Sequence, residues 1–370
     1  MSIAWRDAMA RALYGPGGFF VAGTGPADHF RTSVHASPAF TSALLRLLAQ
    51  VDSALDHPDR LDVVDVGAGR GELLHGLMRG GLAMGDARRS PDEPSPVAVG
   101  PTLAERVRFT AVELAPRPEH LPEEIGWVSE IPAGINGLLI GTEWLDNVPL
   151  DVAVHTEDGW RYVLVDPESG AETIGKLVRP DDLDWLTTWW PTARPAQGSS
   201  LTARSRPGCP ETPHSDHVRA EIGRTRDDAW ARAVSSIERG MALAVDYGHL
   251  REARPVDGTL TGYRAGRQVP PVPDGSADVT VHVAMDSVAS AGAAVARCAY
   301  SLVSQREALR ALGADGGRPP LSLAGTDPAG YVRALAAASA AAELTDPAGL
   351  GGHWWLRQPV GIPLGPAVAR

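Results

Sequence analysis

The sequence predicts an α/β fold organised around a parallel sheet. Three features support this: short strand-like runs rich in Val, intervening segments with apolar residues at helical spacing, and a glycine-rich turn directly after the first run. The chain has 370 residues, enough for two domains or for one large domain with insertions. Its content of 44% hydrophobic and 21% charged residues excludes fibrous and wholly disordered classes.

Each element has its own signal. Apolar residues at helical spacing predict helices at 3–13, 38–54, 72–79, 216–239, 304–312 and 331–342. Short apolar runs predict strands at 61–66, 107–112, 137–141, 241–245 and 277–283. A turn rich in glycine at 14–18 ends the first helix, because glycine and proline interrupt regular structure.

The order of these elements suggests four parts. We expect an N-terminal helical segment over 1–55, a first part of the α/β core over 56–150, an insertion over 151–215, and the second part of the core with C-terminal helices over 216–370. The insertion interrupts the alternation of strands and helices. We interpret its tryptophans as the core of a second lobe rather than as an aromatic cage; they are Trp160, Trp185, Trp189 and Trp190.

The charge balance limits the partners. Acidic residues outnumber basic ones by 45 to 34, for a net charge of -11. Such a chain lacks the basic surface that binds a phosphate backbone, so we expect no nucleic-acid partner. A cationic protein segment or a neutral small molecule fits better. We interpret Arg224, Arg226 and Arg232 as the solvated face of a helix.

The number of cysteines and the length of the apolar runs limit where in the cell the protein is expected. Only Cys209 and Cys298 are present, too few for a disulfide framework or a four-cysteine zinc site, so we expect a cytoplasmic protein without a metal. The pair His214 and His217 lacks further ligands and lies among prolines. Residues 1–14 have no apolar signal region, and no apolar run reaches the roughly 18 residues of a membrane span.

The glycine turn is the most informative motif. It reads Asp65-x-Gly67-x-Gly69-x-Gly71 between a predicted strand and helix, where glycines let the backbone approach a ligand. A dinucleotide site uses Gly-x-Gly-x-x-Gly to seat a pyrophosphate, which the carboxylate of Asp65 would repel. That carboxylate suits the ammonium of a zwitterionic ligand such as S-adenosylmethionine (SAM). Glu113, at the end of the next strand, can accept both ribose hydroxyls of either cofactor. The alternative is a purely structural turn and an unrelated glutamate.

Residues 63–73 resemble motif I of class I SAM-dependent methyltransferases, and further segments narrow the resemblance to the MidA-like family. Six segments follow in the family's order: Asp28-His29-Phe30-Arg31-Thr32-Ser33, Glu143-Trp144-Leu145-Asp146-Asn147-Val148-Pro149, Asp246-Tyr247-Gly248-His249, and those at 258–264, 278–283 and 304–309. The resemblance implies a Rossmann-like methyltransferase sheet with N-terminal and central insertions. It also implies SAM as cofactor and, as in the family's mitochondrial complex I assembly factor, an arginine of a partner protein as methyl acceptor.

The resemblance also assigns cofactor residues and shows departures. It implies SAM contacts with the motif I residues, with Glu113 and with a residue of the first segment; the set is Asp65, Gly67, Ala68, Gly69, Gly71, Glu113 and Thr32. Thr142 replaces the family's Asn, Trp144 and Leu145 replace its paired Phe, and Ala284 replaces an Asp. Residues 353–355 match poorly. These departures concern the methyl acceptor more than the cofactor.

Four residues are candidates for catalysis. Glu143 and Asp146 follow a predicted strand and lie three residues apart, so both carboxylates can hold a guanidinium; Glu143 is our first choice. Asp246 also ends a strand and can orient the acceptor or Tyr247. His282 can relay a proton at neutral pH. In the alternative interpretation Asp146 caps a helix, Glu143 is solvated and His282 is structural.

Several functions therefore remain open at the level of sequence. The favoured one is SAM-dependent methylation of a protein arginine. The others are a non-catalytic assembly or binding factor with a SAM fold, a small-molecule methyltransferase, and a dehydrogenase, against which the glycine spacing speaks. The sequence leaves the oligomeric state open.

Overall fold

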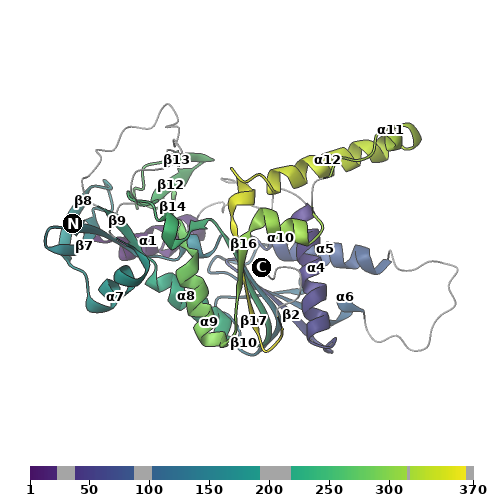
Figure 1. Ribbon diagram of the computed structural model, residues 1–370, viewed down its shortest axis with the longest axis horizontal. Coiled ribbons are helices and arrows are strands. Elements are labelled where there is room, and N and C mark those ends of the chain that lie inside the picture. Colours follow the sequence, from purple (N-terminus) through teal and green to yellow (C-terminus); the bar gives the residue numbers. More distant parts are fainter. Residues whose placement is uncertain (23–37, 87–101, 192–217, 315–316, 364–370) are drawn as a thin grey trace.

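The computed structural model describes residues 1–22, 38–86, 102–191, 218–314 and 317–363. The helices are α1 (Trp5–Tyr14), α2 (Phe19–Ala22), α4 (Pro38–Ala54), α5 (Glu72–Asp86), α6 (Leu103–Arg106), α7 (Pro180–Trp189), α8 (Arg224–Ser235), α9 (Met285–Ala296), α10 (Gln305–Ala311), α11 (Ser322–Thr326) and α12 (Pro328–Leu344), with short 3₁₀ turns η2 (Leu145–Asn147), η3 (Arg251–Ala253) and η4 (Leu350–Gly352). Figure 1 shows a sheet-containing core on one side and a smaller lobe on the other.

A seven-stranded sheet forms the core. Its order is β16 (Ser301–Ser304), β17 (Trp354–Val360), β10 (Ile237–Asp246), β5 (Ile135–Thr142), β2 (Leu61–Val66), β3 (Val107–Val112) and β4 (Ile125–Val128). The strands β10, β5, β2, β3 and β4 are parallel, whereas β17 is antiparallel to both of its neighbours. The predicted α/β fold with a parallel sheet is confirmed.

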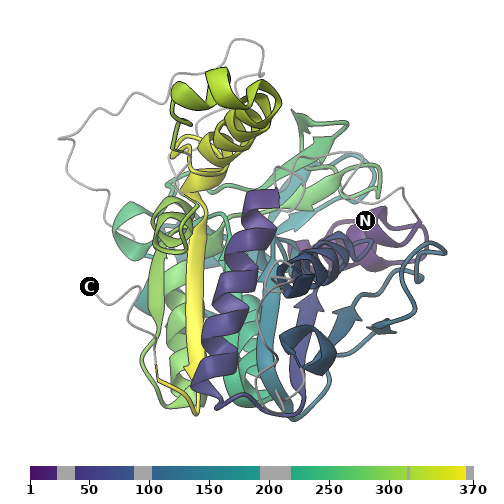
Figure 2. The ribbon, with the colours of Figure 1, turned by 90° about the vertical axis from the view of Figure 1, so that its right-hand side faces the viewer.

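Alternating side chains of the sheet bury two separate layers. Val63 packs with the apolar faces of α4, α5 and α10, and its neighbour Val64 packs with α8 and α9. This follows from the period of two along a strand, which sends successive side chains to opposite faces. Figure 2 shows α4 running across one face of the sheet beside β17. The helices on both faces leave the carboxyl ends of the parallel strands as the place for a site.

The smaller lobe is built on an antiparallel sheet. Its order is β1 (Ile3–Ala4), β7 (Gly159–Val165), β6 (Asp151–Thr156) and β9 (Arg219–Ile222), and β8 (Glu172–Leu177) pairs with the free side of β7. Helix α1 covers one face through Trp5, Met9 and Leu13. Trp160, Trp185 and Trp190 are buried on the other face with α7, so these tryptophans form a core, as predicted.

Two small sheets complete the arrangement. The strands β13 (Arg267–Val269), β12 (Thr261–Arg264) and β14 (Asp278–Thr280) form one, and β11 (Gly248–His249) pairs with β15 (Val283–Ala284) in the other. Helix α1 contacts β14, so this small sheet adjoins the lobe.

The helix predicted over 216–239 is wrong. Its described part consists of β9, α8 and the beginning of β10. Val218, Ala220 and Ile222 alternate with polar residues, which is the two-residue period of a strand, and Gly223 then separates β9 from α8. The helical spacing of apolar residues over 216–239 comes mainly from the part that forms α8. The strand predicted over 277–283 is divided into β14 and β15.

Candidate active site

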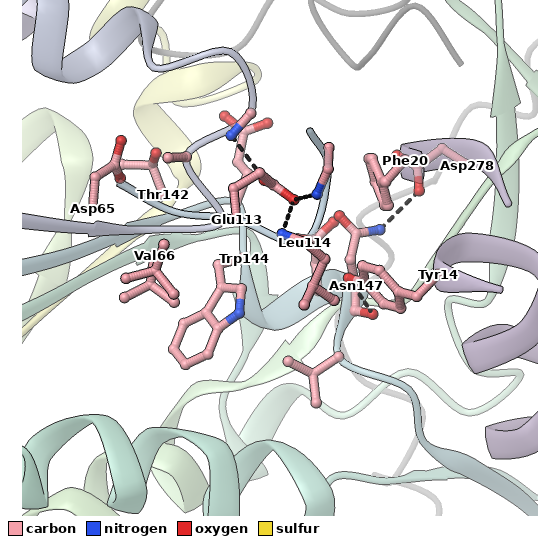
Figure 3. A pocket seen from close by; sticks show the side chains of 18 of the residues that line it. Tyr14, Phe20, Asp65, Val66, Glu113, Leu114, Thr142, Trp144, Asn147 and Asp278 are labelled. Atoms are coloured by element: carbon pink, nitrogen blue, oxygen red, sulfur yellow. Dashed lines mark hydrogen bonds between the residues drawn. The ribbon is translucent and has the colours of Figure 1, made fainter. Parts of the chain in front are cut away.

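A cavity of about 940 Å³ opens at the carboxyl ends of β2, β3, β5 and β10. Its lining comes from the core sheet and also from α1, α2, β12 and β14. In Figure 3, Asp65 and Thr142 lie at one end, Tyr14, Asn147 and Asp278 lie at the other, and Trp144 lies between them. We call the first end the cofactor half and the second end the acceptor half. The volume falls in the range of small-molecule sites.

The glycine turn forms the floor of the cofactor half. Gly67 and Gly69 have φ angles of 71° and 58°, in the left-handed region that side chains disfavour. The N–H groups of Gly67 and Ala68 both donate to the Val112 carbonyl, at 3.0 and 3.3 Å, which fastens the turn to the end of β3. Ala68 and Gly69 line the cavity with Gly67, as the sequence predicted, whereas Gly71 is not among the lining residues.

Asp65 carries a buried carboxylate beside this turn. Its side chain is 2% exposed, and its Oδ1 has no hydrogen-bond partner among the described residues. Burial raises the pKa of Asp65 well above its usual range, and the nearby charges of Glu113 and Glu72 raise it further. An unpaired buried carboxylate is costly, and an ammonium group beside it removes that cost. The residue therefore fits the amino group of SAM.

Glu113 connects the turn to the next strand. Its Oε2 accepts from Gly69 N at 3.0 Å, and its Oε1 accepts from Leu114 N at 2.7 Å and Ala115 N at 3.1 Å. These bonds, drawn in Figure 3, fix the carboxylate in the cavity wall. A carboxylate has about four lone-pair positions, and three are used here, so Glu113 can still accept a hydrogen bond from one ribose hydroxyl. Thr32 lies outside the described residues.

Asp146 is the centre of the acceptor half. It lies in η2, directly after β5, and is 2% exposed. Its Oδ2 accepts from the hydroxyls of Tyr247 and Thr280, the latter at 2.6 Å, while its Oδ1 has no partner among the described residues. Burial raises the pKa of Asp146, and these two hydrogen bonds and the charge of Arg226 act in the opposite direction. Asp146 does not cap a helix, since Trp144 holds that position of η2.

Glu143 and Asp278 bring two more carboxylates to the lining of the cavity. Glu143 has a φ of 49°, rare for a residue with a side chain, and its N–H donates to Val245 O at 2.8 Å. Asp278, on β14, accepts from Asn147 Nδ2 at 2.8 Å. Burial and the charge of Asp146 raise the pKa of Asp278 well above its usual range. Carboxylates from separate parts of the chain thus line the same cavity.

Asp246 lies behind the cavity wall and not among the residues that line it. It is fully buried, and its Oδ2 accepts from the backbone N–H groups of Leu145 at 2.9 Å and Asp146 at 3.3 Å. Its Oδ1 accepts from Tyr247 N at 2.9 Å. Asp246 therefore holds the backbone of Asp146 and Tyr247 and does not line the acceptor half.

His282 lines the acceptor half beside Tyr247, with ring centroids 5.2 Å apart. The residue is exposed on the cavity side. Desolvation by the surrounding protein, with the charges of Arg226 and His353, lowers its pKa to about 4. The ring is thus neutral at pH 7. It is a weaker base than the expected neutral-pH relay requires.

The sequence analysis missed several lining residues: Tyr14, Phe20, Asn147, Tyr247, Tyr263, Asp278, Thr280 and His353. Five of them stand inside segments that carry the family resemblance, so that signal was available: Asn147, Tyr247, Tyr263, Asp278 and Thr280. Tyr14 was assigned to a turn. In the structure it ends α1 and donates to Asn147 O at 3.3 Å, which only the packing of α1 onto the lobe brings about.

Arg226 corrects another prediction. It was expected on a solvated helix face, but its side chain is 1% exposed. Within the described residues no group of three or more His, Cys, Asp or Glu side chains has the arrangement of a metal site. Across the same residues, no helix has both the length and the apolar character needed to cross a membrane.

A glycine turn after a parallel strand, a buried acid before it and an acid at the end of the next strand define a SAM-binding α/β protein. Comparison with known proteins agrees. A family model described as S-adenosyl-L-methionine-dependent methyltransferase matches residues 43–302. The mitochondrial protein arginine methyltransferase NDUFAF7 of Xenopus tropicalis is 26% identical over 278 residues, which is 70% of this chain and 59% of that relative.

Two crystal structures from Burkholderia thailandensis have the same fold, each with a TM-score of 0.71 at 22% identity. One is bound to S-adenosyl-homocysteine, and the alignment covers 98% of this chain and 89% of that one. The other is a native structure, with coverages of 100% and 90%. The chain belongs to the matched family of SAM-dependent methyltransferases. The predicted MidA-like resemblance and the SAM cofactor are confirmed.

Proposed function

We propose that this methyltransferase modifies an arginine side chain of a partner protein. The observation that carries the proposal is the pair of buried carboxylates in the acceptor half, Asp146 and Asp278. Each is less than a tenth exposed, and both have raised pKa values. A cation between them relieves the repulsion and the desolvation that raise these values.

A guanidinium suits this site better than a point charge. It is planar and presents five N–H donors, so it can meet carboxylate oxygens from two directions. The apolar part of the acceptor half is aromatic: the rings of Tyr14 and Phe20 stack with centroids 5.7 Å apart, and both line the cavity. Planar cations pack well on such rings. The net charge of -11 also favours a cationic segment over an acidic one.

Methylation requires the acceptor to lose a proton. Bound SAM supplies a methyl group already activated on a sulfonium. Transfer forms an N–C bond, breaks the S–C bond and releases one proton from the guanidinium nitrogen. Asp146 is our candidate for the residue that takes this proton, because its Oδ1 has no partner among the described residues and its pKa is raised. Tyr247 and Thr280 hold the other carboxylate oxygen and keep the group oriented.

The Xenopus tropicalis relative supports the same substrate class, since it is named as a protein arginine methyltransferase.

The test uses an array of arginine peptides, a matched array with lysine in place of arginine, and free guanidino compounds. Each is incubated with the full chain and methyl-labelled SAM, and acid hydrolysis identifies the methylated amino acid. We expect methylarginine from the first array alone. Label on lysine would contradict the proposal, and label on free guanidino compounds alone would replace the protein substrate with a small molecule.

Asp146→Asn tests the proton acceptor. We expect it to lower kcat/KM for the best arginine peptide by about 100-fold, with S-adenosyl-homocysteine affinity within about twofold of the unmodified protein. Asp184→Asn, at an exposed acid of α7, is the matched control. Equal activities of the two variants would exclude Asp146 as the base.

A further inference from the structure

The side chain of Arg226 joins two separate segments of the cavity wall. It lies in α8, and its guanidinium donates to four backbone carbonyls. Nε donates to Val148 O at 3.1 Å, Nη1 to Val281 O at 2.8 Å and His282 O at 3.1 Å, and Nη2 to Asp146 O. Among the described residues, its direct partners are carbonyls rather than carboxylates.

These two segments carry the acceptor half. The first, 146–148, follows β5 and holds Asp146; the second, 280–282, leads from β14 to β15 and holds Thr280 and His282. They touch each other directly through Thr280 Oγ1, which donates to Asp146 Oδ2 at 2.6 Å. The Arg226 guanidinium bonds to the backbone of both segments. The distance between the segments therefore depends on the width of this one group.

We propose that Arg226 is a positioning residue that sets the geometry of the acceptor half without touching the acceptor. This rests on the proposed function, which assigns the acceptor to these walls. The cofactor half has separate supports. Its glycine turn is fastened to β3 through Val112 O, and Glu113 is held by Gly69 and by its own following residues. A change at Arg226 therefore acts on the acceptor half and spares cofactor binding.

Arginine is the residue type that this role requires. Its rigid fork of five donors can reach four carbonyls in two directions, whereas a lysine ammonium has three donors around one point. Burial lowers the pKa of Arg226, while the nearby charges of Asp146, Asp246 and Glu221 favour its charged form. The preceding residue adds to the contact: Thr225 Oγ1 donates to Pro149 O at 2.6 Å.

The test compares Arg226→Lys with Arg224→Lys in the full chain. Arg224 is on the same helix and pairs with Asp182, away from the cavity, so it controls for loss of an arginine from α8. Three properties are measured: calorimetric affinity for S-adenosyl-homocysteine, hydrogen exchange by mass spectrometry, and steady-state methylation of the best arginine peptide.

For Arg226→Lys we expect unchanged cofactor affinity, within about twofold, and at least about tenfold faster exchange in 144–149 and 279–284 but not in 61–71 or 107–115. The KM of the peptide rises or its kcat falls by about tenfold or more. Arg224→Lys matches the unmodified protein. Unchanged exchange in both wall segments overturns the proposal. A loss of cofactor affinity as large as the loss of activity toward the peptide also overturns it.

A milder variant covers the case in which Arg226→Lys does not fold. Thr225→Val removes only the bond to Pro149 O, and we expect faster exchange in 144–149 with no change in 279–284. Uniform acceleration along the chain would contradict the inference. Exchange and cofactor affinity need no methyl acceptor. Failure of the arginine peptides therefore counts against the proposed function, while these two measurements still decide the role of Arg226.

Discussion

Gly67 keeps the glycine turn in contact with a tryptophan. A Cβ built on Gly67 would lie 3.2 Å from Trp144 Cδ1, in a backbone with a φ of 71°. The indole thus packs directly on the turn that forms the floor of the cofactor half. Gly141 faces the same indole, because a Cβ there would lie 2.9 Å from Trp144 Cε3. Where the family has phenylalanine, this chain uses two glycines to seat a larger ring.

Gly67→Ala is therefore expected to weaken the cofactor site. The substitution strains the left-handed turn and pushes Trp144 toward the cavity, so affinity for S-adenosyl-homocysteine should fall about tenfold, or about 1.4 kcal/mol. Calorimetric titration measures this. Gly325→Ala is the control, since a Cβ at this α11 position meets nothing within 4 Å. Unchanged affinity in Gly67→Ala would show that the turn relaxes without cost.

Asp65 makes a sharper prediction about which part of the ligand it binds. Asp65→Asn should weaken S-adenosyl-homocysteine by about tenfold or more, because the carboxylate no longer pairs with the ammonium. Methylthioadenosine, which lacks the amino-acid portion, should bind both proteins within about twofold. Parallel calorimetric titrations with the two ligands give the comparison. An equal loss for both ligands would place Asp65 elsewhere than at the ammonium.

At the scale of elements, three helices meet at one carboxylate. Asp227 of α8 accepts from Trp185 Nε1 of α7 at 2.7 Å and from Ser287 Oγ of α9 at 2.5 Å. Burial raises the pKa of Asp227 to about 7, against these hydrogen bonds. The junction of the lobe helix α7 with the core thus contains a group that titrates near neutral pH.

The sign of its effect on stability follows from linkage. The folded state binds the proton of Asp227 more tightly than the unfolded state, so the group's contribution is complete below pH 4 and is lost as pH rises through about 7. Between pH 5 and 8 the free energy of unfolding should fall by about 2 kcal/mol more in the unmodified protein than in Asp227→Asn. Urea unfolding at both pH values measures the difference.

Asp228→Asn provides the matched control, because Asp228 is exposed on the same helix. It should retain most of the pH dependence of the unmodified protein, because the charge of Asp228 contributes less than burial to the raised pKa of Asp227. An identical pH dependence in Asp227→Asn would show that this carboxylate does not titrate in the range.

At the scale of the whole molecule, the two halves of the cavity differ in how far sequence predicts them. The cofactor half lies in one strand–turn–helix unit and the end of the next strand, so local spacing was sufficient to place Asp65, the glycines and Glu113. The acceptor half draws on α1, η2, β12 and β14. Its members meet only after the lobe packs on the core, and no local period encodes that.

Arg226 and Asp246 are two further residues, whose burial and bonding to backbone the sequence did not predict. Both are polar residues in ordinary positions of a helix and a strand end. Periodicity assigns a polar residue to solvent or to a site, but each is buried and bonded to backbone groups of distant segments. Because every residue has backbone N–H or C=O groups, a side chain that bonds to backbone does not require any particular residue type in the partner segment. The strand β9 was not predicted because its four residues are too few to show a clear alternation beside the longer helical pattern of α8.

The sheet of the lobe takes its strands from three separate stretches: Ile3 and Ala4 pair with β7, β6 to β8 follow one another, and β9 arrives from residue 219 onward. The lobe is therefore not formed by one continuous insertion. A fragment that contains only residues 151–215 lacks β1 and β9. Its pairings span much of the chain, so we expect them to form late in folding, after the more local strand–helix units of the core. Recombination between related genes can therefore transfer the cofactor turn as a single piece, whereas it must carry all three stretches to transfer the sheet of the lobe.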